Sequence, residues 1–168
     1  MAIRSFKPKK KIMKKLVASI VFSLLGRAIK ACYRLDTRVK EEFNDLPEGL
    51  VIKMLIKPIG PFIMIKREGN EIIIIKDSNV KADLNIEFKN IEGALLALTA
   101  KKSVATCYAE QRFIILGDLS YGTAFVRIMN IVETYLFPRI WNAFIFNNQA
   151  PNRERNKMRI LIGTIFGI

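Results

Sequence analysis

Residues 81–118 read KADLNIEFKNIEGALLALTAKKSVATCYAEQRFIILGD, and the spacing of apolar residues changes repeatedly within them. The first eight letters alternate polar and apolar residues, which is the period of a strand with one buried face. Asn90 is the expected cap of a short helix over Ile91–Thr99. Ser103–Glu110 predicts another helical turn, and Phe113–Leu116 returns to strand. The segment therefore predicts two strands separated by two short helices.

Three strand candidates precede this segment. They are Leu50–Ile56, Phe62–Lys66 and Ile72–Lys76, the last two joined by the hairpin signal Glu68-Gly69-Asn70. The run from Ile72 to Ile75 is apolar on both sides, so both faces of that part of the sheet need covering. We expect an N-terminal helix on one face and the later helices on the other.

A long helix is expected after residue 118. Gly117-Asp118 ends the last strand, and Asp118 is the expected cap of a helix over Leu119–Phe137. Pro138 resets the chain before a second helix, Arg139–Phe146. The predicted fold class is therefore α+β, with a mostly antiparallel twisted sheet of about five strands packed with helices.

The composition excludes several kinds of chemistry. The chain has 168 residues, 51% of them apolar, which suits one folded domain. It has no histidine, so imidazole bases, His-dependent nucleophiles and imidazole metal sites are excluded. Its two cysteines cannot form a zinc site by themselves, and we expect Cys107 to be an inert core thiol. We therefore expect a protein that is not an enzyme and uses no cofactor or metal, in a reducing cytoplasmic setting.

Positive charge is concentrated near the N-terminus. Ten of the 28 Lys and Arg residues, and no acidic residue, lie within residues 1–35, while the net charge of the whole chain is +13. Seven of the ten precede the uncharged run 16–26, and the five nearest to it are Lys9, Lys10, Lys11, Lys14 and Lys15. That run would cover roughly 16 Å as a helix, about half of a bilayer core, so it does not span one. We expect these lysines to contact an anionic membrane surface. Few aromatic residues accompany them, which argues against nucleic acid as the partner.

Apolar residues recur every four positions between residues 9 and 34, which predicts one amphipathic helix. Two interpretations of its wide apolar arc stay open. The helix packs on the protein's own sheet with its lysines in water, or it lies in the interface of an anionic membrane where the lysines contact lipid. Both states can alternate in one protein.

The chain divides into three parts. We expect a basic amphipathic N-terminal helix within residues 1–44, a central domain over 45–147, and a polar linker with an apolar tail over 148–168. The tail is too short to cross a bilayer. It docks on the domain, enters a neighbour's pocket, or rests in the membrane interface.

The order of the predicted elements, with three short phrases inside it, resembles the sterol carrier protein 2-like (SCP2) domain over residues 45–147. The phrases are Ala82-Asp83 in the alternating strand, Leu96-Ala97-Leu98-Thr99 followed by Lys101, and Gly117-Asp118 before the long helix. The sequence departs from the family pattern at two turns. Ala100 stands where the family usually has glycine, and Glu110 stands where a second glycine often precedes the last strand.

The resemblance implies an apolar tunnel that holds a fatty acyl chain, a sterol, an isoprenoid or a phospholipid tail. Some bacterial relatives are accessory factors in quinone biosynthesis that present polyprenyl intermediates to membrane enzymes. Strand and helix parity would place eleven apolar side chains on the tunnel wall: Leu84, Ile86, Phe88, Leu95, Leu98, Phe113, Ile115, Phe125, Ile128, Met129 and Val132. The alternative is that these side chains fill an ordinary core.

A polar stripe is expected on the long helix, where Arg127, Asn130 and Glu133 recur every three residues. It either contacts a ligand head group at the tunnel mouth or is a solvated helix face, which is the commoner case.

Our hypothesis from the sequence is a non-catalytic protein, cytoplasmic and peripheral at the membrane. It binds a lipid ligand with a long apolar chain, of fatty acyl, sterol, isoprenoid or quinone type, and transfers or presents it; a homodimer is compatible with this hypothesis. The alternative is an interaction scaffold that docks a partner enzyme without a bound lipid. The high Ile and Lys contents are compatible with an AT-rich prokaryotic source.

Overall fold

The computed structural model describes residues 12–136, 160 and 162–164 of the chain. A five-stranded sheet has the order β3-β2-β1-β4-β5, in which β1 and β4 are parallel and the other neighbours are antiparallel. The strands are β1 (Val51–Ile56), β2 (Phe62–Glu68), β3 (Glu71–Ile75), β4 (Leu84–Phe88) and β5 (Phe113–Leu116). The predicted α+β class and the mostly antiparallel sheet are confirmed.

Within residues 12–136 the helices are α1 (Ile12–Leu35), α2 (Thr37–Asn44), α3 (Ile91–Leu98), α4 (Val104–Ala109) and α5 (Leu119–Leu136). The two predicted caps are present. The side chain of Asn90 accepts a hydrogen bond from the Gly93 amide at 2.7 Å, and that of Asp118 accepts one from the Ser120 amide at 2.8 Å. Helix α2 was not predicted, and the predicted helix Arg139–Phe146 lies outside the described residues.

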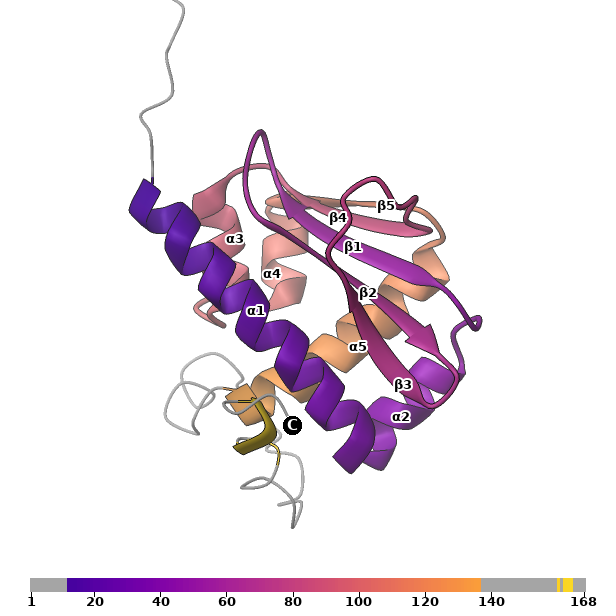
Figure 1. Cartoon of the computed structure of the whole chain (residues 1–168). Coiled ribbons are helices and arrows are strands. Elements are labelled where there is room, and N and C mark those ends of the chain that lie inside the picture. Colours follow the sequence, from indigo (N-terminus) through magenta and orange to yellow (C-terminus); the bar gives the residue numbers. More distant parts are fainter. Residues whose placement is uncertain (1–11, 137–159, 161, 165–168) are drawn as a thin grey trace, which may run out of the picture.

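Helices α1 and α5 lie on the same face of the sheet (Figure 1). The strand registers place Leu84 of β4 and Ile74 of β3 on one face. Gly26 of α1 lies against Ile74, and Gly122 of α5 lies against Leu84. The prediction that the N-terminal helix and the later helices cover opposite faces is therefore wrong. The outward-facing Ile73 instead stays 38% exposed, since single apolar side chains are commonly tolerated on a protein surface.

The two Asp-containing phrases of the sequence meet at one end of the sheet. The Val51 amide donates to the Asp83 carboxylate at 2.9 Å, which ties the start of β1 to the start of β4. Gly117 has a φ of 127°, and a Cβ there would lie 2.4 Å from the carbonyl oxygen of Asp83. Only glycine fits at residue 117, because both the backbone angle and the close approach exclude a side chain.

Left-handed backbone also occurs at the two turns where the sequence departs from the family pattern. Ala100 has a φ of 51°, and Gln111, one residue after Glu110, has a φ of 52°. Both residues adopt a conformation that glycine adopts at lower cost. The first departure thus falls on a left-handed residue, whereas in the second turn the left-handed residue lies one position after Glu110.

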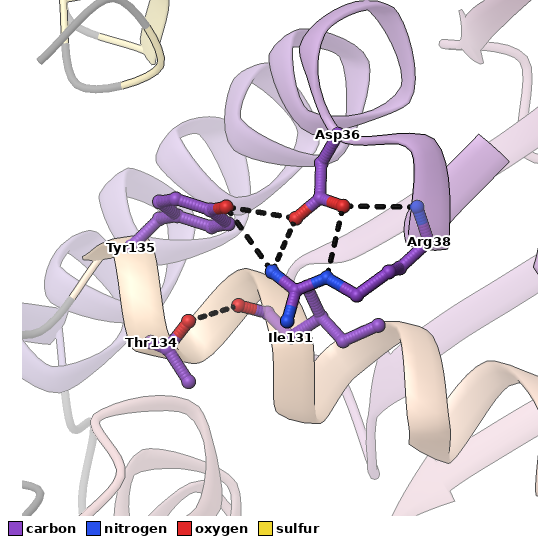
Figure 2. Close-up of polar contacts among 5 residues, drawn as sticks. All are labelled: Asp36, Arg38, Ile131, Thr134 and Tyr135. Atoms are coloured by element: carbon purple, nitrogen blue, oxygen red, sulfur yellow. Dashed lines mark hydrogen bonds and ion pairs between the residues drawn. The ribbon is translucent and has the colours of Figure 1, made fainter. Parts of the chain in front are cut away.

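A buried hydrogen-bond cluster joins the α1–α2 junction to the end of α5 (Figure 2). Asp36 is 1% exposed and caps α2 by accepting the Arg38 amide at 2.9 Å. Its carboxylate also accepts from the Arg38 guanidinium at 2.8 and 3.1 Å and from the Tyr135 hydroxyl at 2.8 Å. Burial alone would raise the pKa of Asp36, but the hydrogen bonds from Arg38 and Tyr135 outweigh it and hold that pKa below its ordinary value.

The described part of the C-terminal tail packs on its own chain. Ile160 is fully buried within the hydrophobic core, and the buried Thr164 hydroxyl donates to the Ile160 carbonyl at 2.8 Å. Of the three placements considered for the tail, these residues adopt docking on the domain.

Candidate functional site

An apolar cavity of about 30 Å³ lies between the sheet and helices α3, α4 and α5. It is lined by one residue of β1, two of β4, one of β5 and seven from α3 to α5: Met54, Ile86, Phe88, Ala97, Leu98, Val104, Phe113, Phe125, Val126, Met129 and Glu133. A volume of this size has room for roughly one or two water molecules. Any larger guest must therefore displace the side chains of the wall.

The strands supply the wall through their two-residue period. Ile86 and Phe88 of β4 point to the helix-covered face, and Phe113 of β5 is the register partner of Phe88. The rings of Phe88 and Phe113 lie 5.4 Å apart between centroids, within the range for favourable aromatic contacts. The helix α5 supplies Phe125 and Met129, which are one turn apart and thus share a face.

The structure distributes the eleven predicted wall residues between the cavity and the core beside it. Six line the cavity: Ile86, Phe88, Leu98, Phe113, Phe125 and Met129. Leu84, Ile128 and Val132 are fully buried in the core, and Leu95 and Ile115 are partly buried against it. Sequence reasoning missed Met54, Ala97, Val104, Val126 and Glu133. A role of any of these residues in ligand binding stays a prediction.

Glu133 is the polar member of the cavity wall. Its side chain is 2% exposed, and neither carboxylate oxygen has a hydrogen-bond partner among the described residues. Burial raises the pKa of Glu133 to about 8, because the apolar surroundings disfavour the charged form. The expectation of a solvated polar stripe holds for Asn130 and Arg127, which are exposed, and is wrong for Glu133.

The other titratable groups near the cavity are either a buried thiol or side chains that are paired with one another. The Cys107 thiol is buried, and burial raises its pKa, which agrees with the expected inert thiol. On the exposed side of α4, Glu110 pairs with both Lys102 and Arg112. Arg127 of α5 donates to both carboxylate oxygens of Glu42, at 2.8 and 2.9 Å.

Helix α1 consists of two unlike halves. Its second half is mostly buried against the domain, whereas its first half exposes an apolar stripe that ends at Leu24: Ile12, Met13, Leu16, Val17, Ile20 and Leu24. By length and composition alone α1 could cross a membrane, but half of its most apolar stretch is buried within the structure. Of the five predicted membrane-contact lysines, Lys14 pairs with Glu92 at 2.9 Å and Lys15 is exposed. Lys9, Lys10 and Lys11 lie outside the described residues.

The exposed half of α1 and the β1–β2 turn lie at the same end of the domain (Figure 1). The Lys57 amide donates to the Phe88 carbonyl at 2.9 Å, just before α3, and Lys14 pairs with Glu92 in the first turn of α3. Ile59, in that turn, is 79% exposed. This end thus presents apolar side chains from two separate elements beside the lysines of α1.

No protein-family model matches the chain, and no curated protein matches it. A solved structure named UbiJ-SCP2 ubiquinone synthesis protein is similar to it, with 14% sequence identity and a TM-score of 0.47. The match covers 75% of this chain and 100% of that one. The fold class follows from this chain's own strands and helices.

Proposed function

We propose that the protein is a non-catalytic lipid-binding protein that takes an apolar chain into the cavity between the sheet and α3–α5. The observation that carries this proposal is the wall itself, in which ten of the eleven lining residues are apolar. Burial of hydrocarbon supplies affinity at about 25 cal/mol for each Å² removed from water. Met54 and Met129 are flexible side chains that adapt to a guest of irregular shape, which supports expansion of the cavity on binding.

The first test is native mass spectrometry of the full chain purified without detergent. Solvent extraction and identification of whatever is released would follow. We expect an adduct with a hydrocarbon tail at about one per chain. A clean mass of the protein alone, together with no loading by fatty acids, sterols or quinones, would contradict lipid binding.

We propose further that the exposed half of α1 brings the protein reversibly to an anionic membrane. Leu16 and Ile20 are 55% and 52% exposed although they are large and apolar, and Lys15 lies beside them in the sequence. An amphipathic helix with this composition binds the interface through apolar insertion and attraction of lysine to anionic lipid. The exposed Ile59 at the same end supports a common contact plane.

Two variants separate the two contributions to membrane binding. Replacing Lys9, Lys10, Lys11, Lys14 and Lys15 by Gln should weaken flotation with phosphatidylcholine–phosphatidylglycerol vesicles by at least about tenfold. Leu16→Asp should weaken binding at high salt as well, because insertion does not depend on screening. The controls are Lys76 and Lys81 changed to Gln, compared per lysine removed, and Leu119→Asp, all at exposed positions elsewhere. Equal losses in variants and controls would refute a specific role for α1.

A second candidate function is an interaction scaffold that binds no lipid, and the small size of the cavity favours it. Met129→Trp separates the two candidates, since Met129 lines the cavity. If the cavity binds lipid, the indole should block uptake. If the cavity is only an imperfection of the core, the variant should mainly lose stability, by about 1–3 kcal/mol.

A further inference from the structure

The carboxyl group of Glu133 is buried, and none of the described residues forms a hydrogen bond with it. The other residues of the cavity wall are apolar, and both Glu133 oxygens are buried without a hydrogen-bond partner among the described residues. A buried polar group without a partner costs roughly 1–3 kcal/mol of stability. Neither oxygen is exposed in the empty cavity, so the carboxyl group has to turn toward a guest; a guest that brings a hydrogen-bonding group to it would then recover part of that cost.

From this arrangement we infer that Glu133 binds the polar end of the ligand, and that this end is an uncharged hydroxyl group on a hydrocarbon chain, as in a long-chain alcohol or an alkyl phenol. The inference rests on the proposed lipid-binding function and adds the class of head group. The apolar wall alone would bind any hydrocarbon of suitable size, whatever its head group.

The chemistry of the two groups is complementary. With a pKa of about 8 the Glu133 carboxyl is mostly protonated at neutral pH, so it offers one O–H donor and one carbonyl acceptor. A hydroxyl group also has one donor and acceptor lone pairs, so two reciprocal hydrogen bonds can form. An alkane offers neither and leaves the carboxyl unpaired.

An anionic head group lacks a partner in this cavity. The described residues that line it include no lysine or arginine, and a buried anion without a cation is strongly disfavoured. Lys102 and Arg112, which flank α4 in the sequence, are both paired with Glu110. The buried Cys107 thiol is neutral and supplies no positive charge. A fatty acid carboxylate therefore fits less well than an alcohol of the same length.

The test compares three probes that differ only in the head group. 1-Octanol, octane and octanoate are titrated at pH 7 into the full chain, freed of lipid, and followed by amide chemical shifts in NMR. In the wild type we expect octanol to bind at least about tenfold more tightly than octane or octanoate. Glu133→Leu should reduce the preference for octanol over octane to within about twofold, while octane still binds. Glu133→Gln should keep most of the preference, since an amide also donates and accepts.

A control variant and an infrared measurement test whether the octanol preference comes from Glu133. Glu68→Gln, at an exposed position in β2, is the matched control and should leave all three affinities unchanged. The infrared carbonyl band of protonated Glu133, identified by its absence in Glu133→Gln, should shift when octanol binds. This band does not respond to a merely structural role of the side chain.

Each outcome separates the inference from the function on which it rests. If the wild type binds none of the probes, the proposed lipid binding fails and the inference fails with it. If octane and octanol bind alike, if octanoate binds most tightly, or if the octanol preference survives Glu133→Leu, the head-group inference is overturned while lipid binding stands.

Discussion

Asp36 and Glu133 are two acidic side chains that are almost completely buried, yet they differ in how many hydrogen bonds they accept. Asp36 accepts four hydrogen bonds, from the Arg38 backbone and guanidinium and from the Tyr135 hydroxyl, and these lower its pKa. Glu133, two residues before Tyr135 on the same helix, accepts none from the described residues, and burial raises its pKa to about 8. The hydrogen-bonded Asp36 therefore stabilises the fold, whereas the unpaired Glu133 lowers its stability. A stability cost at a cavity wall is typical of a site that serves binding instead.

The largest expected effect comes from removing the satisfied carboxylate. Asp36→Ala should lower the free energy of unfolding by about 4 kcal/mol, because Arg38 and Tyr135 lose their acceptor and α2 loses its cap. Urea unfolding at neutral pH measures this loss. A loss below about 1 kcal/mol would show that the cluster in Figure 2 does not stabilise the fold.

The next effect is a pH dependence of opposite sign for the two groups. Since the pKa of Glu133 rises from an ordinary 4.5 to about 8 on folding, its contribution to stability is full below the lower value and is lost as the pH rises to the higher one. The slope approaches about 1.4 kcal/mol per pH unit, which amounts to about 3 kcal/mol by pH 7. Asp36 has a lowered pKa, so its contribution is lost only as the pH falls below 3.8.

Urea midpoints measured from pH 5 to 9 check this dependence. In Glu133→Gln the decline between pH 5 and 8 should be absent, because the amide does not titrate in this range. Slopes are compared rather than absolute stabilities, because the amide itself is buried. A decline of the same size in the variant would assign it to another group.

A smaller effect is expected when one donor is removed from the satisfied site. Tyr135→Phe deletes the hydroxyl that donates to Asp36 at 2.8 Å and accepts from the Arg38 guanidinium at 3.3 Å, and it leaves the contacts between Arg38 and Asp36 in place. We expect a loss of about 1–2 kcal/mol, as for one hydrogen bond to a charged group. If Tyr135→Phe costs as much as Asp36→Ala, the hydroxyl rather than the Arg38 pair dominates the cluster.

A carboxylate near the surface, with its side chain 22% exposed, gives the reference point of the comparison. Glu42 pairs with Arg127 at 2.8 Å on the surface of the domain. Glu42→Gln should leave the urea midpoint unchanged within error, since exposed ion pairs contribute little. A clear destabilisation would mean that pairing, and not burial, decides how much a carboxylate contributes in this protein.

Much of the fold could be predicted because its elements follow local rules. The alternation over residues 82–88 and the caps at Asn90 and Asp118 each depend only on neighbouring residues, and the structure contains all three features. The parallel pairing of β1 with β4 could not be predicted in this way, because the two strands pair across the intervening hairpin of β2 and β3. The packing of both long helices on one face of the sheet could not be predicted from neighbouring residues either.

The candidate site was predicted less completely, and Glu133 shows why. An α-helix turns by about 100° per residue, so each three-residue step falls about 60° short of a full turn. Two such steps carry Glu133 about 120° around α5 from Arg127, out of the solvent and onto the side of Met129, four residues earlier. Four-residue spacing from Met129 and eight-residue spacing from Phe125 were the signals that could have placed it in the wall.

The strand order also has a consequence for when the cavity forms. β1, β2 and β3 make a meander of neighbouring strands that can pair soon after chain collapse, whereas β4 reaches β1 only after a 32-residue separation, as between Ile52 and Leu84. The cavity wall draws on β1, β4, β5 and α5, so it is completed only when this distant pairing is made. Proteins open in contiguous units that differ in free energy, and we expect the unit completed by this late pairing to open before the meander. Amide hydrogens of β4 and β5 should then exchange with solvent faster than those of β1 and β2, which would give a hydrocarbon chain its way in without unfolding of the meander.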